Sequence, residues 1–107
     1  MQNIGKISLR NEGSFDVAME IVYWTDVIPK TQVPATDSYP VGELKTVDPG
    51  DLGVPNNSYV SLYVDVDSGE DNASGDEYLY TPDLDVIASY VICGSAEENY
   101  LGLLHVG

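Results

Sequence analysis

The stretch Tyr59-Val60-Ser61-Leu62-Tyr63-Val64-Asp65-Val66-Asp67 decides the fold of this chain. Its even-numbered residues are all aliphatic, whereas its odd-numbered residues carry a hydroxyl or a carboxylate. Side chains of a β-strand point alternately to opposite faces of a sheet. This period of two therefore predicts a strand with one buried face and one solvated face.

A second stretch, residues 15–24, repeats the pattern. Its odd-numbered positions are apolar, and Asp16 and Glu20 fall on the other face. Shorter runs predict further strands at residues 7–10, 44–47, 86–93 and 100–106. The last two runs have apolar residues on both faces, which is typical of a central strand or of one covered on both sides.

Turn-forming residues separate these runs, and no window long enough to test shows a helical period. Residues 25–40 contain three prolines and predict an irregular crossover or an edge strand. Short strands joined by Gly- and Pro-rich turns are typical of an all-β fold. We therefore expect a single antiparallel β-sandwich of about 7–8 strands that comprises residues 1–107.

The charge of the chain is strongly one-sided. Its 107 residues include 4 basic and 18 acidic side chains, a net charge of −14 at pH 7. The basic residues all precede Thr46, and they are Lys6, Arg10, Lys30 and Lys45. Because phosphate binding depends on Lys and Arg, this charge excludes nucleic acid as a partner and weakens adhesion to anionic lipid. An alternative reading of the acidity is adaptation of the source organism to high salt.

No apolar stretch approaches the length that crosses a bilayer, so we expect no transmembrane span. The N-terminal residues show no signal-peptide pattern. Trypsin-like proteases find no cleavage site after Lys45, so most of the chain should resist them. This resistance favours a secreted or released protein, although no signal-peptide pattern is seen. Cys93 is the only cysteine, so an internal disulfide is excluded, and its apolar neighbours Val91 and Ile92 predict a buried thiol.

The segment from Asp65 to Glu77 is the most suggestive of chemistry. Its six carboxylates are Asp65, Asp67, Glu70, Asp71, Asp76 and Glu77. Hard oxygen ligands at this density suit calcium, although the spacing does not match a helix-loop-helix calcium loop. A solvated acidic loop, or charges that keep strand edges from pairing, are the alternatives.

No residue pattern predicts catalysis. The acidic segment has no apolar pocket that would raise the pKa of one carboxyl for acid–base work. His105 is the single histidine and cannot form a histidine-based metal cluster, so we expect it to be an ordinary residue of the last strand. The sequence therefore favours a protein that is not an enzyme.

The order of the segments resembles the C-terminal membrane-recognition β-sandwich of the thiol-activated (cholesterol-dependent) cytolysins and its small single-domain relatives. Residues 13–24 are similar to the first long strand of that domain, and residues 41–47 to its short strand before a turn. Residues 60–65 and 88–94 resemble the strands that lead to its two recognition loops. The resemblance implies a β-sandwich whose target-binding loops hold Ser68, Gly69, Gly94, Ser95, Ala96 and Glu97.

The functional positions of that family are not kept. Its Cys-Thr-Gly step falls on Asp67-Ser68-Gly69, and its tryptophans are replaced by residues 70–74, which include Glu70 and Asp71. Its sterol-recognising Thr-Leu pair falls on Ala96 and Glu97. Because inserting a carboxylate into a bilayer costs a few kcal/mol, we do not expect cholesterol-dependent insertion.

Two functions remain open. The first is a non-enzymatic binding module, toxin-like or lectin-like, whose loops recognise a cell-surface glycan, lipid or protein, with calcium as a conceivable aid. The second is a structural protein that assembles with copies of itself once divalent ions, salt or low pH relieve its acidic charge.

Overall fold

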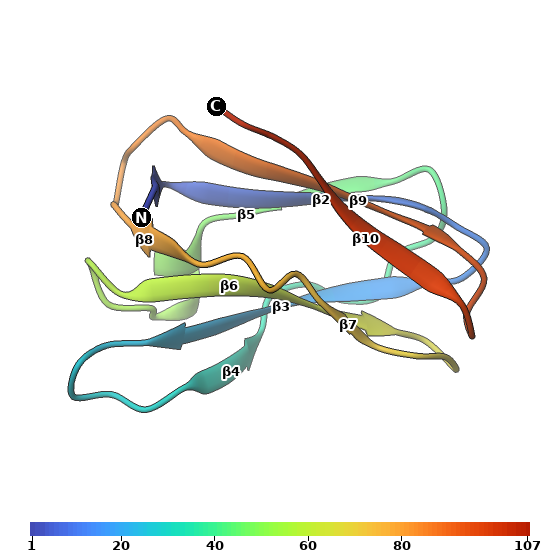
Figure 1. Cartoon of the computed structure of the whole chain (residues 1–107), viewed down its shortest axis with the longest axis horizontal. Helices are drawn as coiled ribbons and strands as arrows, with labels where there is room; N and C mark the ends of the chain where they lie inside the picture. Colours follow the sequence, from blue (N-terminus) through green and yellow to red (C-terminus); the bar gives the residue numbers. More distant parts are fainter.

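The computed structural model describes residues 1–107 and shows two packed β-sheets (Figure 1). One sheet contains, in spatial order, β1 (Asn3–Ile4), β8 (Tyr78–Tyr80), β6 (Tyr59–Val66), β3 (Val17–Trp24) and β4 (Thr31–Pro34), with β7 (Asn72–Ala73) also paired to β6. The other contains, in spatial order, β10 (Asn99–Val106), β9 (Ile87–Gly94), β2 (Lys6–Gly13) and β5 (Leu44–Val47). A short 3-10 helix, Pro49–Leu52, follows β5. The predicted all-β sandwich is confirmed.

The two stretches with the cleanest alternation form the centre of the first sheet. β3 and β6 pair antiparallel along their whole length, from Val17 opposite Val66 to Trp24 opposite Tyr59. The aliphatic residues expected on the inner face of β6 are all buried, as are the odd-numbered residues 15–21. They form most of a single core between the sheets, together with Ile7 and Leu9 of β2 and Tyr90 and Ile92 of β9.

The strands differ from the prediction in direction and length. β1 pairs with β8, and β2 with β9, in parallel, whereas a wholly antiparallel sandwich was expected. Parallel neighbours need a long crossover, and between β2 and β9 the chain builds nearly the entire opposite sheet. Side chains alternate with a period of two in parallel and in antiparallel strands, so the sequence could not reveal the relative direction of paired strands. Eight strands have three or more residues, as expected, and β1 and β7 are two-residue additions.

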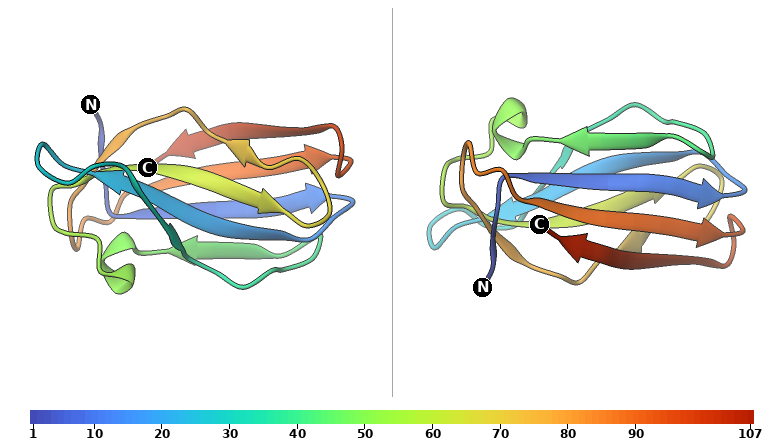
Figure 2. Two further views of the ribbon diagram at one scale, coloured as in Figure 1. Left: turned by 90° about the horizontal axis from the view of Figure 1, so that it is seen from below. Right: turned by 90° about the horizontal axis from the view of Figure 1, so that it is seen from above.

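Two burial predictions were wrong. β10 was expected to be a central strand or one covered on both faces, but it is the edge strand of its sheet (Figure 2). Tyr100, Leu103 and Leu104 of this strand are exposed. Cys93 was expected to be buried, but it lies at the end of β9 and is exposed. β9 itself is central, as expected, with alternate residues buried. The expected edge strand within residues 25–40 is β4.

Candidate binding loops at one end of the sandwich

Three loops meet at one end of the sandwich, and we call them together the loop end: residues 13–16, 67–71 and 94–98. They gather at the right-hand end of the view in Figure 1. The strand register brings them there. Because β2 and β9 run in parallel, Gly13 lies opposite Gly94, and the pairing of Val17 with Val66 places the end of β6 beside the start of β3.

Main-chain hydrogen bonds join the three loops. The Glu70 amide donates to the Ala96 carbonyl at 2.8 Å, and the Ser14 amide donates to the Gly94 carbonyl at 3.1 Å. The main chains of Gly69 and Ala96 approach so closely that a Cβ on Gly69 would collide with the Ala96 carbonyl oxygen. Glycine is therefore required at position 69 by packing, and the second loop cannot move independently of the third.

The structure brings all six sequence-predicted binding residues together at the loop end. Ser68, Gly69, Gly94, Ser95 and Glu97 are exposed, and Ala96 is half-buried beneath them. Gly94 adopts φ +104°, a conformation that favours glycine, and it turns the chain out of β9. These residues thus form one continuous surface with a defined main-chain shape.

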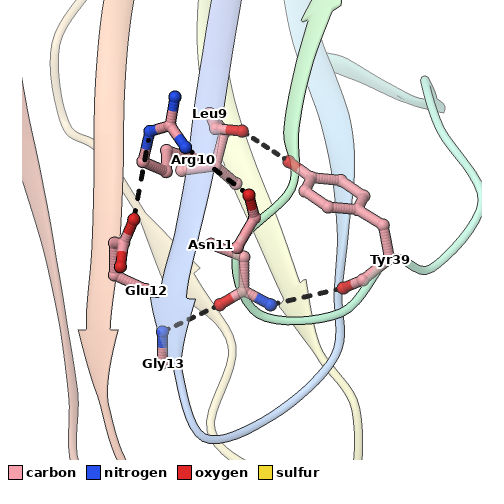
Figure 3. Close-up of polar contacts among 7 residues, drawn as sticks. Leu9, Arg10, Asn11, Glu12, Gly13 and Tyr39 are labelled. Atoms are coloured by element: carbon pink, nitrogen blue, oxygen red, sulfur yellow. Dashed lines mark hydrogen bonds and ion pairs between the residues drawn. The ribbon is translucent and has the colours of Figure 1, made fainter.

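Asn11 is the residue that sequence reasoning missed. It is fully buried in β2, and its Nδ2 donates to the carbonyl oxygens of Phe15 at 2.6 Å and Tyr39 at 3.2 Å. Its Oδ1 accepts from the Gly13 amide at 2.9 Å (Figure 3). One side chain therefore fixes the loop between β2 and β3. An asparagine followed two residues later by glycine signals a turn, but nothing local signals its burial.

Tyr39, which accepts one of the hydrogen bonds of Asn11, is itself bonded to β2 and β3. Its hydroxyl donates to the Leu9 carbonyl at 2.9 Å (Figure 3). Its main chain pairs with that of Val17. Burial raises the pKa of this hydroxyl strongly above its usual value, and the nearby Glu43 carboxylate adds to the shift. Tyr39 therefore stays neutral and anchors the long connection between β4 and β5 over the core.

The six carboxylates predicted to hold calcium are not arranged around one point. No group of three or more His, Cys, Asp or Glu side chains is placed to hold a metal ion. Calcium binding stays a prediction from the sequence.

Asp71 is occupied in shaping its own loop. Its carboxylate accepts from the Val66 amide at 2.9 Å and from the Tyr63 hydroxyl at 2.8 Å. The bond from Val66 lowers the pKa of Asp71, and the bond from Tyr63 lowers it further. The pKa of the neighbouring Asp65 is raised, first by desolvation and then by the Asp71 carboxylate. Asp71 therefore holds its charge, and Asp65 takes up a proton first as the pH falls.

Asp76 lies away from Asp71 and belongs to a tyrosine network inside the sandwich. The hydroxyls of Tyr78 and Tyr90 lie 2.6 Å apart, and the Tyr90 hydroxyl donates to Asp76 at 2.9 Å. A third pair joins Tyr80 to Asp48 at 2.6 Å beside the 3-10 helix. Three of the eight tyrosines therefore bond to an aspartate, and these three carboxylates are engaged within the fold.

Exposed carboxylates, Asp71 among them, give the loop end its charge. Six lie in its three loops, and all are exposed: Asp16, Asp67, Glu70, Asp71, Glu97 and Glu98. No Lys or Arg occurs in these loops. Lys6 and Lys30 lie toward the opposite end, where a hollow of about 300 Å³ is lined by Lys6, Asp48 and four neighbours. The charged side chains of the three loops are thus all acidic.

No protein-family model matches the chain, and a search of the curated proteins found no relative. The cytolysin resemblance therefore rests on the pattern of strands and glycines in the sequence. The structure contains no helix that is both long and apolar enough to cross a membrane.

Proposed function

We propose that the protein is a non-enzymatic binding domain that recognises a positively charged target with its loop end. The observation that carries this proposal is the joining of three sequence-distant loops into one surface that has six exposed carboxylates and no basic residue. Loops held on a rigid scaffold are the usual place for recognition, and fixed loops lose little entropy on binding.

The sign of the charge narrows the target. A surface of clustered carboxylates repels anionic lipid and attracts Lys- or Arg-rich proteins, and it accelerates their association. Among the targets that the sequence left open, a basic protein surface fits the loop end better than a lipid. A neutral glycan would need aromatic side chains or hydrogen-bonding amides, whereas the exposed loop residues are mainly small or acidic.

The side chains with perturbed pKa values support the proposal that the protein is not an enzyme, because they are engaged in contacts within the fold. Asp71, Tyr63, Tyr80 and Tyr90 have perturbed pKa values and bond to one another or to nearby partners within the fold. None of them lines the hollow near Lys6. Hydrogen bonds are the main cause of the pKa shifts of Asp71 and Tyr63, whereas desolvation by burial, followed by hydrogen bonds, raises the pKa values of Tyr80 and Tyr90.

The test compares two triple variants with equal change in charge. Glu70→Gln, Glu97→Gln and Glu98→Gln remove three of the six carboxylates of the loop end, whereas Asp26→Asn, Asp51→Asn and Asp83→Asn remove three carboxylates from the opposite end. Calorimetry measures binding of a synthetic lysine-rich peptide at physiological salt. We expect the loop-end variant to bind about tenfold more weakly, since surface ion pairs contribute about 0.5 kcal/mol each, and the control to bind like wild type.

Equal weakening in both variants would show that the peptide senses only net charge, and it would overturn the proposal. Binding to neutral glycans or to phosphatidylcholine vesicles, with no binding of the basic peptide, would overturn the charge argument in favour of the other targets.

A further inference from the structure

β10 is the one long edge strand of the molecule without a charged residue or a proline, and its pairing with β9 is interrupted only between Leu103 and His105. Natural sheets discourage edge pairing with short strands, prolines or lysines. β4 has four residues and ends in Pro34, and β5 has four residues and contains Lys45. β10 has eight residues, with no proline and no Asp, Glu, Lys or Arg among them. In a chain of net charge −14, an uncharged edge of this length is a distinct feature.

The outer side of this edge offers both hydrogen-bonding groups and apolar surface. In an antiparallel pair, alternate residues turn their main-chain groups away from the partner strand. Pairing of β10 with β9 leaves the amides and carbonyls of Leu101, Leu103 and Val106 pointing outward. Tyr100 is 63% exposed and Leu104 59%. In Figure 2 the strand is the outermost of its sheet, along the side opposite β5.

We propose that β10 pairs antiparallel with β10 of a second copy, so that two four-stranded sheets join into one continuous sheet. This inference goes beyond the loop-end function and does not depend on it. An uncharged, apolar strand complements another uncharged, apolar strand, and a basic partner would find no carboxylate on β10 to bind. A two-fold axis also satisfies the same outward groups on both copies.

The direction of pairing follows from the charge of the loop end. Glu97 and Glu98 directly precede β10, so parallel pairing would bring the two acidic loop ends together. Antiparallel pairing places them at opposite ends of the dimer. The irregularity in the β10 ladder between Leu103 and His105 exposes Leu104, which would then contact the second copy near the axis.

The remaining repulsion between two chains of −14 is long-ranged and is therefore screened by salt. The screening length falls from about 8 Å at physiological ionic strength to about 3 Å at 1 M. Apolar contacts across the strands are not weakened by salt in this way. Dimerisation through β10 should therefore strengthen as sodium chloride is added.

The experiment measures the mass of the full chain by sedimentation velocity, with two variants of equal charge change. Leu104→Lys places a charge on the edge, and Val27→Lys places the same charge on an exposed turn residue far from β10. We expect wild type and Val27→Lys to dimerise, more so at high salt, and Leu104→Lys to stay monomeric. A monomeric wild type at all salt concentrations overturns the proposal, as does equal dimerisation of both variants.

Hydrogen exchange on the wild type provides a second test that needs no variant. The amides of Leu101, Leu103 and Val106 should gain at least about tenfold protection when the protein concentration rises a hundredfold, because dimer formation follows mass action. Unchanged protection at these amides in a sample that dimerises would place the contact elsewhere and overturn the proposal.

Discussion

The side-chain amide of Asn99 donates to the main-chain carbonyl of Glu70 at 2.7 Å and ties together two loops that are far apart in the sequence. The Oδ1 of Asn99 also accepts from the Asn72 amide at 2.8 Å. Asn99 thus connects the start of β10 with the loop between β6 and β7 and with the start of β7. The loop end is held in one shape by such bonds, and this is what makes it suited to recognition.

Replacing Asn99 with alanine should loosen the loop end without unfolding the domain. We expect faster hydrogen exchange at residues 68–70 and a loss of about 1 kcal/mol of stability, since one bond is partly buried and the other is exposed. Asn56→Ala, in an exposed turn, is the matched control. Unchanged exchange at residues 68–70 in Asn99→Ala would show that the main-chain bonds alone hold the loop.

The substitution Asn11→Asp should destabilise the whole domain. An aspartate has the shape of asparagine but cannot donate to the Phe15 and Tyr39 carbonyls, and its charge would be fully buried. An uncompensated buried charge costs about 3–5 kcal/mol. Denaturant unfolding measures the loss, with the exposed Asn56→Asp as control. A loss below about 1 kcal/mol in Asn11→Asp would contradict the role given to this side chain.

The tyrosine network predicts unequal effects of removing single hydroxyls. Tyr90→Phe leaves the buried Tyr78 hydroxyl without its partner and Asp76 without a donor, which should cost about 1–3 kcal/mol. Tyr100→Phe removes the hydroxyl of a side chain that is largely exposed and should change stability by less than about 0.5 kcal/mol. Thermal unfolding compares the two. Equal losses of stability in Tyr90→Phe and Tyr100→Phe would mean that the hydrogen bonds of the Tyr90 hydroxyl do not stabilise the fold.

Alkaline pH should unfold the protein in a defined range. Hydrogen bonding to Asp71 raises the pKa of Tyr63 to about 12, and desolvation followed by the bond to Asp48 raises that of Tyr80 to about 12. The unfolded state, with an ordinary value of 10.0, loses these protons first. The stability from these groups is therefore complete below pH 10 and is lost as the pH rises through 12.

Tyrosinate absorbance at 295 nm together with circular dichroism follows this transition. We expect part of the tyrosinate absorbance to appear only when the sheet signal is lost. Complete ionisation of all tyrosines near pH 10, with the fold intact, would contradict these hydrogen bonds.

The parts of the fold that depend on a local period could be read from the sequence. β3 and β6 alternate so regularly that their existence, inner faces and burial follow from the residue order, and Gly13, Gly69 and Gly94 mark the turns at the loop end. The six predicted binding residues come together because β6 and β9, which lie in the two packed sheets, finish at the same end of the sandwich. Turn residues flanking such strands therefore gave useful predictions.

The other features of the fold depend on contacts between residues that are far apart in the sequence. β9 and β10 have similar apolar sequences, yet β9 is central and β10 is an edge, because the order of strands is decided by the path of the whole chain. The same placement exposes Cys93, at the end of β9. Asn11 is polar by type and buried only because Tyr39 closes over it from a distant loop. Nothing within the acidic segment signals that Asp71 and Asp76 bond to tyrosines on other strands.

The most direct test of the proposed function maps where a basic ligand contacts the wild-type protein. Amide chemical shifts of the isotope-labelled full chain are recorded while a synthetic lysine-rich peptide is added at physiological salt. The account predicts that the shifts concentrate at residues 13–16, 67–71 and 94–98. Shifts that spread evenly over the acidic surface, or that centre on the hollow beside Lys6 and Asp48, would contradict it.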